Sequence, residues 1–575
     1  MATYYWVGGN GTWNNSSTTN WSTSSGGAGG SGPPTNADTV NFDANSGTAA
    51  TVTVESTAVS LNTTINKSDI NLSLSGSPTL CTAAGTLTLT TGTITLNNNV
   101  LTCGIFAASN SNTRAVAFGT GNISVTGNGT IVWSTQNATG FSYTGTPLVK
   151  LTYSGSTGTR TVRNGVSGGA TESNSPSFSI TAGSDIILFT SPNYVKDLDF
   201  TGFTGSWTNS GLQFYGSLVI SSGMTVSAGI NTVSFWATSG TQKITMAGKT
   251  FGFPVSFGNG ATGVATTYQL QDNFTLASTF TTTLVSGTLD LTGNSGNWTL
   301  STGFFASSNS NTRVIIFGTG NITTTGSATV WNTGTVTGFS YTGTPTVNIS
   351  NNSATATTVT TGAMSEAQSL NFNYTVGTYT LTDSSSVYKS LNFTGFTGTI
   401  PNSVRTIYGS MTLVSGMTLT AGANATTFAA TSGTNTITTA AKTLDFPLTF
   451  NGLGGTFSFQ DALTQGSTRA FTITNGTVEL KISVTSTVGS FVATSATMKY
   501  LQSTLAGTQA TLSQASGTVN ASNLTIKDIN ATGGATWNAY YINGDINAGN
   551  NTGWDFLVQL GRYIYSRRKN KVILN

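Results

Sequence analysis

Carboxylates are the residues best suited to chemistry in this sequence, because its 575 residues include no histidine and only two cysteines. The absence of histidine excludes imidazole bases, Ser-His-Asp and Cys-His nucleophiles and imidazole metal ligands. Cleavage of a glycan by two carboxylates remains, and it requires a pair about 5–9 Å apart. Asp197 and Asp199 lie two positions apart on one predicted strand face, but a second copy of this stretch carries Ser390 and Asn392 instead.

The other acids that recur do so one at a time. The recurring pairs are Asp272 with Asp461 and Asp290 with Glu479. Each acid is alone in its neighbourhood, so a cleaving site needs acids from separate parts of the chain to meet in space. The segment Asn543–Asn551 superficially resembles a calcium loop but lacks the glycine and the bidentate glutamate that such a loop requires. We therefore predict a protein that is not an enzyme and that has no catalytic residue, metal site or cofactor.

A polar phrase, SNSNTR, occurs twice, at Ser109–Arg114 and at Ser308–Arg313. Its arginine is present in both copies, and a guanidinium group offers a planar fork of hydrogen-bond donors. Arg114 and Arg313 are therefore candidate glycan contacts. The alternative, which we prefer, is a ladder of Asn and Ser side chains at a corner of a repetitive fold, which explains the phrase without a ligand.

The cysteines, Cys81 and Cys103, are too few for a zinc cage or a disulfide framework. They are 22 positions apart, a spacing that can place them on neighbouring coils of a repetitive fold. We expect both to be small buried apolar side chains in preference to a disulfide.

The first 48 residues differ from the rest because they concentrate tryptophan. Trp6, Trp13 and Trp21 fall within a short stretch that continues into a Gly, Ser and Pro tract. Three such side chains bury a large area from few positions. A stack of repeats needs a cover over its first strand edge, since an open edge recruits other chains. We therefore predict a cap, with an aromatic sugar-stacking or docking patch as the alternative.

The last nineteen residues, 557–575, differ in composition from the rest of the chain, which is rich in Thr and Asn. Docking to a partner protein by strand addition or charge pairing is one role for such a peptide, and a solvated tail is the other. The candidate docking residues are Arg562, Tyr563, Tyr565, Arg567, Arg568, Lys569 and Lys571.

The fold that positions these side chains is built on a tandem sequence repeat of just under two hundred residues. The text of 106–147 returns at 305–345, and DLDFTGFTG at 197–205 returns as SLNFTGFTG at 390–398. The same phrases then begin a third time. Self-similarity on this scale indicates a repeat architecture.

Short runs of alternating apolar and polar residues predict the local structure. Gly85–Thr91 and Gly92–Leu96 alternate strictly, which is the pattern of a strand with one buried face. Gly, Asn-Asn and Ser-Gly break such runs every seven to ten residues, and no helical stripe is present. The pattern continues without a domain break, which favours an all-β, elongated β-solenoid over sandwiches or barrels. Three strands of about five residues per coil give coils of roughly 20–25 residues.

The sequence predicts six segments along this solenoid. They are a Trp-rich capping or attachment segment (1–48), leading coils (49–100), repeat 1 (101–298), repeat 2 (299–495), final coils (496–556) and a basic aromatic docking tail (557–575).

Charge and hydropathy exclude several partners. A net charge of +3 gives no electrostatic case for nucleic acid along the body. No apolar run approaches the ~18–20 residues that span a bilayer, so membrane insertion is not expected. The first residues lack a basic region followed by an apolar one, so we expect synthesis and folding in a cytoplasm.

Three stretches carry a resemblance to a known group of proteins. They are the opening YYWVGGNGTW…TNW…PPTNADTVNFDANS, the text GSMTLVSGMTLTAG…LDFPLTFNG and the ending GRYIYSRRKNK. As a set they resemble large repetitive structural proteins of tailed bacteriophages, particularly marine ones. The resemblance implies a β-solenoid protein of the virion, namely a fibre, an appendage or a capsid decoration. It implies no catalytic residue.

The resemblance also implies partners. Such proteins are commonly homo-oligomers, often trimers, that contact capsid or tail proteins and in some cases a host surface glycan. Similar openings occur in bacterial surface proteins, so a cell-surface adhesin is the first alternative function. A tailspike that cleaves a polysaccharide is the second.

Overall fold

The computed structural model describes residues 1–165, 171–190, 193–209, 211–260, 265–383 and 385–556. Within these residues the regular structure is almost entirely β-strand, and the helical segments are the 3-10 turns η1 (Glu172–Asn174), η2 (Gly293–Ser295) and η3 (Tyr541–Asn543). Strands pair in parallel with strands of the neighbouring coil, which gives a parallel β-solenoid of about 22 turns. The predicted fold class is confirmed.

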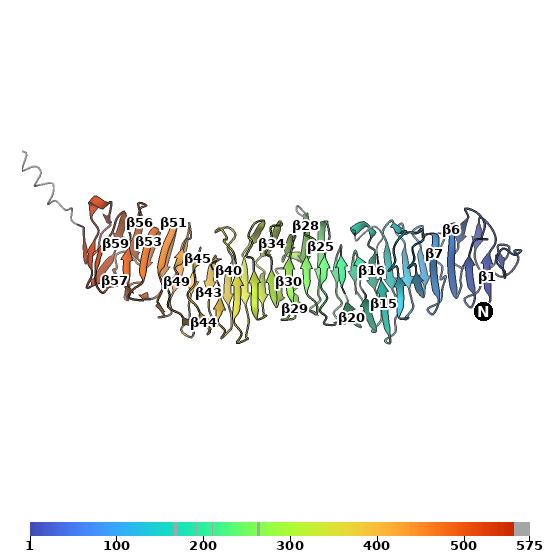
Figure 1. The fold of residues 1–575 in the computed structure, drawn as a ribbon, viewed down its shortest axis with the longest axis horizontal. Helices are drawn as coiled ribbons and strands as arrows, with labels where there is room; N and C mark the ends of the chain where they lie inside the picture. Colours follow the sequence, from blue (N-terminus) through green and yellow to red (C-terminus); the bar gives the residue numbers. More distant parts are fainter. Residues whose placement is uncertain (166–170, 191–192, 210, 261–264, 384, 557–575) are drawn as a thin grey trace, which may run out of the picture. The chain divides into compact units, whose positions relative to one another are not determined.

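The chain forms two compact units, which are described separately. Unit 1 comprises Met1–Ser301 with Asn311–Gly320, and unit 2 comprises Thr302–Ser310 with the described residues from Asn321 onward. In each unit the strands lie one above another, coil upon coil (Figure 1).

Three faces surround the core of unit 1. The first face consists, in spatial order, of β8 (Val100–Cys103), β11 (Asn122–Val125), β14 (Leu148–Leu151), β16 (Ser177–Ile180), β19 (Leu198–Asp199), β22 (Leu218–Val219), β25 (Ser239–Thr245), β28 (Ala265–Leu270), β31 (Gly287–Asp290) and β34 (Arg313–Gly318). The second includes β12 (Ile131–Ser134), β15 (Thr159–Arg163), β17 (Ile186–Phe189), β20 (Ser206–Asn209) and β23 (Thr225–Val226). The third includes β18 (Tyr194–Val195), β21 (Leu212–Phe214), β24 (Val233–Phe235), β27 (Val255–Phe257) and β30 (Thr281–Leu284).

Coil length on the first face varies more than the sequence predicts. Phe178 pairs with Leu198, 20 positions on, whereas Leu148 pairs with Ser177, 29 positions on. The longer coil contains the η1 turn between β15 and β16. An insertion of this kind leaves the strand register intact and projects from the stack, which is where binding sites commonly form.

Alternation places the apolar residues inside. In β7 (Thr86–Thr95), Leu87, Leu89 and Ile94 are fully buried while the threonines between them are half-buried. This pattern confirms the predicted alternating strands. Parallel in-register pairing also stacks like side chains, so that the rings of Phe214 and Phe235 lie 5.1 Å apart.

Unit 2 has the same construction. Its first face includes β35 (Asn321–Thr324), β38 (Thr346–Ile349), β40 (Asn371–Tyr374), β43 (Ser390–Asn392), β46 (Met411–Thr412), β49 (Thr434–Thr438), β51 (Leu448–Phe459), β53 (Ala470–Leu480), β56 (Lys499–Ser503), β59 (Leu524–Lys527) and β62 (Ile546–Asn547). A second includes β42 (Ser386–Tyr388), β45 (Arg405–Ile407), β48 (Thr426–Phe428), β55 (Ser490–Val492) and the first halves of β51 and β53. A third includes β50 (Thr443–Leu444), β52 (Thr464–Gln465), β54 (Thr485–Val488), β57 (Ala510–Gln514) and β60 (Ile529–Gly533).

The sequence repeat is also a repeat of structure. In unit 1, Trp133 stacks on Phe106 with ring centroids 4.5 Å apart. In unit 2 the equivalent Trp331 stacks on Phe305 at 4.6 Å. Each pair joins partner residues of neighbouring parallel strands, so the repeated text encodes the same packing twice.

Candidate functional site

Arg114 lies inside a corner of unit 1. The residue opens β10 (Arg114–Ala117) and is 1% exposed. Its guanidinium donates hydrogen bonds to backbone carbonyls of four residues, and its Cζ lies 5.0 Å from the Phe141 ring centroid. The four acceptors are Ala108, Asn112, Asn137 and Thr139. Burial lowers the pKa of the Arg114 guanidinium below its ordinary value.

Arg313 occupies the same place in the second copy of the phrase. It is fully buried, and its Nε donates to the carbonyl of Asn311 at 3.0 Å. Both guanidinium groups are therefore inside the coil, so the geometry does not offer the surface glycan contact considered from the sequence. Lys499 comes eight residues after Phe491, just as Arg114 comes eight after Phe106. Its Nζ lies within hydrogen-bond distance of four carbonyl oxygens.

The predicted Asn and Ser ladder is a set of links to neighbouring coils. Asn110 donates to the carbonyl of Leu89 at 3.3 Å, and Asn112 donates to that of Thr90 at 3.2 Å. In the second copy Asn311 donates to the carbonyl of Val285 at 3.0 Å. These amide groups thus bond backbone carbonyls of a neighbouring coil.

The three N-terminal tryptophans form one buried cluster. Trp6, Trp13 and Trp21 are fully buried, and Trp6 meets Trp21 edge-on with centroids 4.9 Å apart. Trp21 lies in β3 (Trp21–Ser22), which pairs antiparallel with β1 (Thr3–Trp6) and is the outermost strand of its sheet. This position is the one that a cap requires. Fully buried indoles present no face for sugar stacking.

The cysteines are buried, free thiols. Burial raises the pKa of Cys81 to about 11 and that of Cys103 well above its ordinary value. The preference for buried apolar side chains over a disulfide is confirmed.

The basic tail, 557–575, lies outside the described residues. Its candidate docking residues, from Arg562 to Lys571, therefore remain predictions.

The recurring acids bind backbone and side-chain donors of adjacent coils. Asp272 accepts hydrogen bonds from the N–H groups of Met246 and Ala247 at 2.7 and 2.6 Å. Asp461 accepts in the same way from Thr439 and Ala440. These carboxylates join one coil to the next.

Asp290 and Glu479 also have local partners. Asp290 accepts from Gln269 at 2.8 Å, and Glu479 accepts from Gln502 at 2.8 Å. Each carboxylate thus accepts a hydrogen bond from a side-chain amide of a neighbouring strand. This structural role accounts for both residues without a ligand.

Two hollows adjoin on the outside of unit 1, around the η1 turn. One, of about 720 Å³, is lined by Thr171, Glu172, Ser173, Lys196, Tyr215, Trp236, Thr238, Ser239 and Asn259. The other, of about 610 Å³, is lined by residues that include Thr146, Pro147, Ser177, Ser179, Asp197 and Asp199. Glu172, Ser173 and Lys196 line both hollows. We call the pair the η1 groove.

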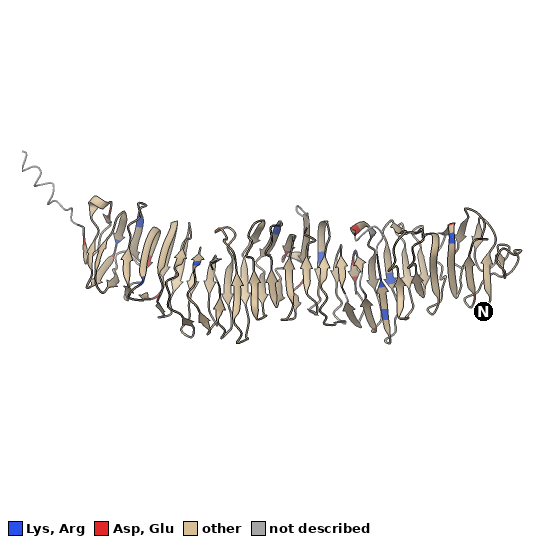
Figure 2. Cartoon of the chain, viewed as in Figure 1, with Lys and Arg blue, Asp and Glu red and all other residues tan. Residues whose placement is uncertain are grey.

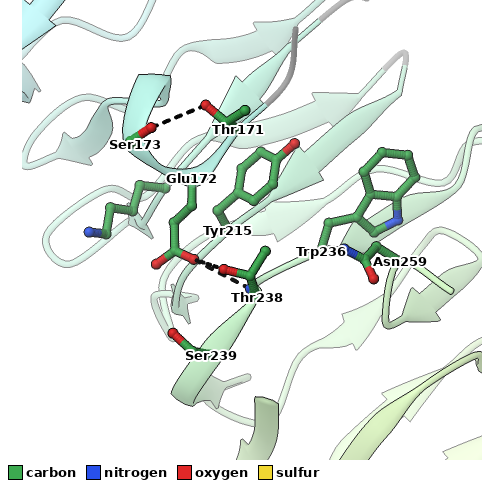
Figure 3. Close-up of a pocket in the computed structure, with 9 residues that line it drawn as sticks. Thr171, Glu172, Ser173, Tyr215, Trp236, Thr238, Ser239 and Asn259 are labelled. Carbon is green, nitrogen blue, oxygen red and sulfur yellow. Dashed lines mark hydrogen bonds between the residues drawn. The ribbon is translucent and has the colours of Figure 1, made fainter. Parts of the chain in front are cut away.

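Glu172 is fixed in position within this groove. Its Oε2 accepts hydrogen bonds from the N–H of Thr238 at 3.3 Å and from the Thr238 hydroxyl at 3.0 Å. Figure 3 shows the two side chains pointing toward one another within the hollow. A segment of one coil is thereby tied to a later coil.

The aromatic lining comes from the third face. Tyr215 follows β21 and is 3% exposed, and Trp236 follows β24 and is half-buried. The Tyr215 hydroxyl has no hydrogen-bond partner among the described residues. Burial raises the pKa of Tyr215 to about 12, so its hydroxyl is neutral at physiological pH.

The structure brings Asp197 and Asp199 to the second hollow together with Glu172. Asp197 accepts from the Ser217 N–H at 2.8 Å, and Asp199 accepts from the Thr201 N–H at 2.8 Å. Acids from different coils thus do line one surface.

Sequence reasoning missed Glu172, Tyr215 and Trp236. One signal was available, because Glu172 recurs as Glu366 and the phrase FWATSG (235–240) recurs as FAATSG (428–433). A single aromatic residue present in only one of two otherwise matching phrases marks a local difference in surface chemistry.

Charge is sparse over the described chain. Figure 2 shows isolated Lys, Arg, Asp and Glu residues separated by long uncharged stretches. Within the ranges that the structure describes, no three Cys, Asp or Glu residues are grouped to hold a metal ion. In the same ranges no helix is long and apolar enough to cross a membrane.

Comparison of the chain with protein-family models, with curated proteins and with solved structures finds no match.

Proposed function

We propose that this chain is a non-enzymatic structural protein of a bacteriophage particle, a fibre, appendage or capsid decoration whose β-solenoid contacts the host surface. The observation that carries the proposal is that the side chains best suited to chemistry make structural contacts within the solenoid. The arginines of the repeated phrase bond backbone carbonyls, both thiols are buried, and the recurring acids bridge coils. The resemblance of the opening, the SGMT text and the ending to phage structural proteins supports the same assignment.

The proposed partners follow from the same role. The body is a homo-oligomer, with a trimer as the expected form, and residues 557–575 dock it to capsid or tail proteins. The tail carries five of the 21 basic residues of the chain, which gives it a charge that the body lacks.

Immunogold electron microscopy on an infected source culture tests the proposal, using antibody raised against residues 49–556. We expect gold on phage particles, and its position distinguishes head from tail. Gold confined to cell envelopes overturns the proposal in favour of the adhesin.

Deletion of 557–575 tests the docking role separately. We expect a folded protein, with its β-sheet circular dichroism unchanged, that no longer joins particles. A matched control keeps the tail length and replaces its five basic residues with serine, which separates charge from strand addition. Normal incorporation of the deleted chain contradicts the docking role.

A depolymerase is the second candidate, because Glu172, Asp197 and Asp199 line one hollow. Glycan hydrolysis by paired carboxylates releases reducing ends, which a colorimetric assay on host polysaccharide detects. Release that is lost in Glu172→Gln or Asp199→Asn favours this candidate. Absence of release removes it and leaves the structural role.

A further inference from the structure

We infer that the η1 groove of unit 1 binds a neutral oligosaccharide of hexopyranose units, with the indole of Trp236 as the stacking surface for one sugar ring. This inference deepens the proposed host-contacting function and rests on it.

Trp236 differs from the core tryptophans of the same unit. Trp133 and Trp207 are fully buried, whereas Trp236 is half-buried and lines an open cavity whose rim residues Thr238 and Asn259 are exposed. A half-buried indole of this kind offers an apolar ring face with polar groups around it. The C–H face of a pyranose ring can stack on that indole face, and the equatorial hydroxyls of the sugar can hydrogen-bond the polar groups.

The polar groups around Trp236 suit sugar hydroxyls. Both hydrogen bonds that Glu172 accepts from Thr238 reach Oε2, and Oε1 accepts none from the described residues. Oε1 is therefore a fixed acceptor for a hydroxyl of the ligand. Figure 3 shows Thr171, Ser173, Ser239 and Asn259 around the same cavity, and their hydroxyl and amide groups can both donate and accept.

The charges that line the groove favour a neutral glycan over an acidic one. Glu172, Asp197 and Asp199 contribute three carboxylates against the single ammonium of Lys196. Like charges repel an acidic glycan at such a surface. A neutral glycan carries no such penalty, and a few well-placed polar groups fix its orientation.

The size of the groove indicates an oligosaccharide. The two hollows of about 720 and 610 Å³ share Glu172, Ser173 and Lys196, so a ligand in one continues into the other. A single sugar ring fills only part of either hollow. Several linked rings contact both Trp236 in the first hollow and Asp199 in the second.

Unit 2 provides an internal comparison. Glu366 accepts hydrogen bonds from the N–H and the hydroxyl of Thr431, which reproduces the Glu172 link. The residue at the position of Trp236 is Ala429. The scaffold is thus repeated without the stacking ring, so we expect binding in unit 1 and not in unit 2.

Isothermal titration of the full chain with neutral hexasaccharides tests the inference. The probes are cello-, malto-, laminari-, manno- and chitohexaose, with a galacturonic acid hexamer as the acidic comparison. We expect one neutral probe to bind at a single site, with quenching of tryptophan fluorescence. Trp236→Ala should weaken it about tenfold or more, which corresponds to about 1.4 kcal/mol.

Two matched controls make the test specific. Trp298→Ala removes another half-buried indole outside the groove, and Glu366→Gln alters the equivalent link of unit 2. Both should bind as the unaltered chain does, while Glu172→Gln should bind more weakly.

Failure of all neutral probes to bind, or equal binding by Trp236→Ala and Trp298→Ala, overturns the inference. Preferential binding of the galacturonic acid hexamer also overturns it. Because the titration uses purified protein, its failure is distinct from failure of the particle assignment, which immunogold labelling decides.

Discussion

The carboxylate of Glu172 bonds both the backbone N–H and the hydroxyl of Thr238, a residue 66 positions later in the chain. Glu366 bonds Thr431 in the same manner across 65 positions. The first link fastens the η1 insertion of unit 1 to a later coil. A side-chain contact thereby holds a segment that the strand ladders do not hold.

Removal of this link should loosen its surroundings without unfolding the chain. In Glu172→Ala we expect faster amide exchange at Thr238, because its N–H loses its acceptor, and a change of less than about 1 kcal/mol in stability. Hydrogen exchange followed by mass spectrometry over the peptides around η1 and Thr238 measures the effect. Glu366→Ala is the matched control and should leave those peptides unchanged.

A buried ion pair should matter far more. Arg160 and Asp185 of unit 1 are both fully shielded from solvent and are joined by two hydrogen bonds of 2.8 Å. Asp185→Asn leaves the guanidinium charge buried without its partner, which costs about 3–5 kcal/mol. Urea unfolding followed by tryptophan fluorescence measures the loss.

The exposed pair Arg469–Asp445 serves as the control for that experiment. Its side chains are 23% and 41% exposed, so Asp445→Asn should change stability by about 0–1 kcal/mol. Equal effects of the two substitutions contradict the role assigned to burial.

Much of the fold was predictable from sequence because strand alternation is a local property. Leu87 and Leu89 show their inward direction within one short run, and the repeated text shows that the pattern continues. Coil length was less predictable, since the insertion that carries η1 changes the spacing from 20 to 29 positions without changing the pattern of the strands.

The candidate site was largely unpredictable because it depends on contacts between coils. Glu172 and Trp236 are brought to one cavity by coils whose lengths differ, and neither residue belongs to a known motif. The buried pair Arg160–Asp185 was equally hidden, because its members are 25 positions apart. For SNSNTR, the sequence favoured a structural corner over a glycan contact, but it did not show that the arginines are buried and bond backbone carbonyls.

The corner cation should tolerate lysine better than an apolar residue. Lys499 already bonds four carbonyl oxygens at the equivalent position. Arg114→Met leaves carbonyl groups of the corner unbonded and should lower stability by about 2–4 kcal/mol, while Arg114→Lys should recover part of this loss. Equal destabilisation by the two variants, measured in urea, would show that packing of the side chain dominates and not its hydrogen bonds.

The thiols should be inert until the chain opens. Cys81 and Cys103 are buried, and burial raises the pKa of both, so little thiolate is present or accessible at neutral pH. We expect no reaction with an aromatic disulfide reagent in the native protein and reaction of both thiols in guanidinium chloride. Rapid labelling of the native chain contradicts the buried placement.

Asp545 should make the C-terminal coils sensitive to pH. The residue is 2% exposed, its Oδ1 accepts from the Leu524 N–H at 2.9 Å, and its Oδ2 has no partner among the described residues. Burial raises its pKa from 3.8 to about 6, partly opposed by the Leu524 hydrogen bond and by the positive charge of Lys499.

Because the folded-state pKa lies above the unfolded one, the protonated carboxyl stabilises the fold at low pH, and this contribution disappears as the pH rises through about 6. Asp545→Asn removes the titrating group and should be more stable than the unaltered chain at pH 7, by about 1–3 kcal/mol. The difference should shrink as the pH falls from 7 toward 4. Urea unfolding at several pH values, followed by tryptophan fluorescence, measures it. A difference that is independent of pH contradicts the assignment to Asp545.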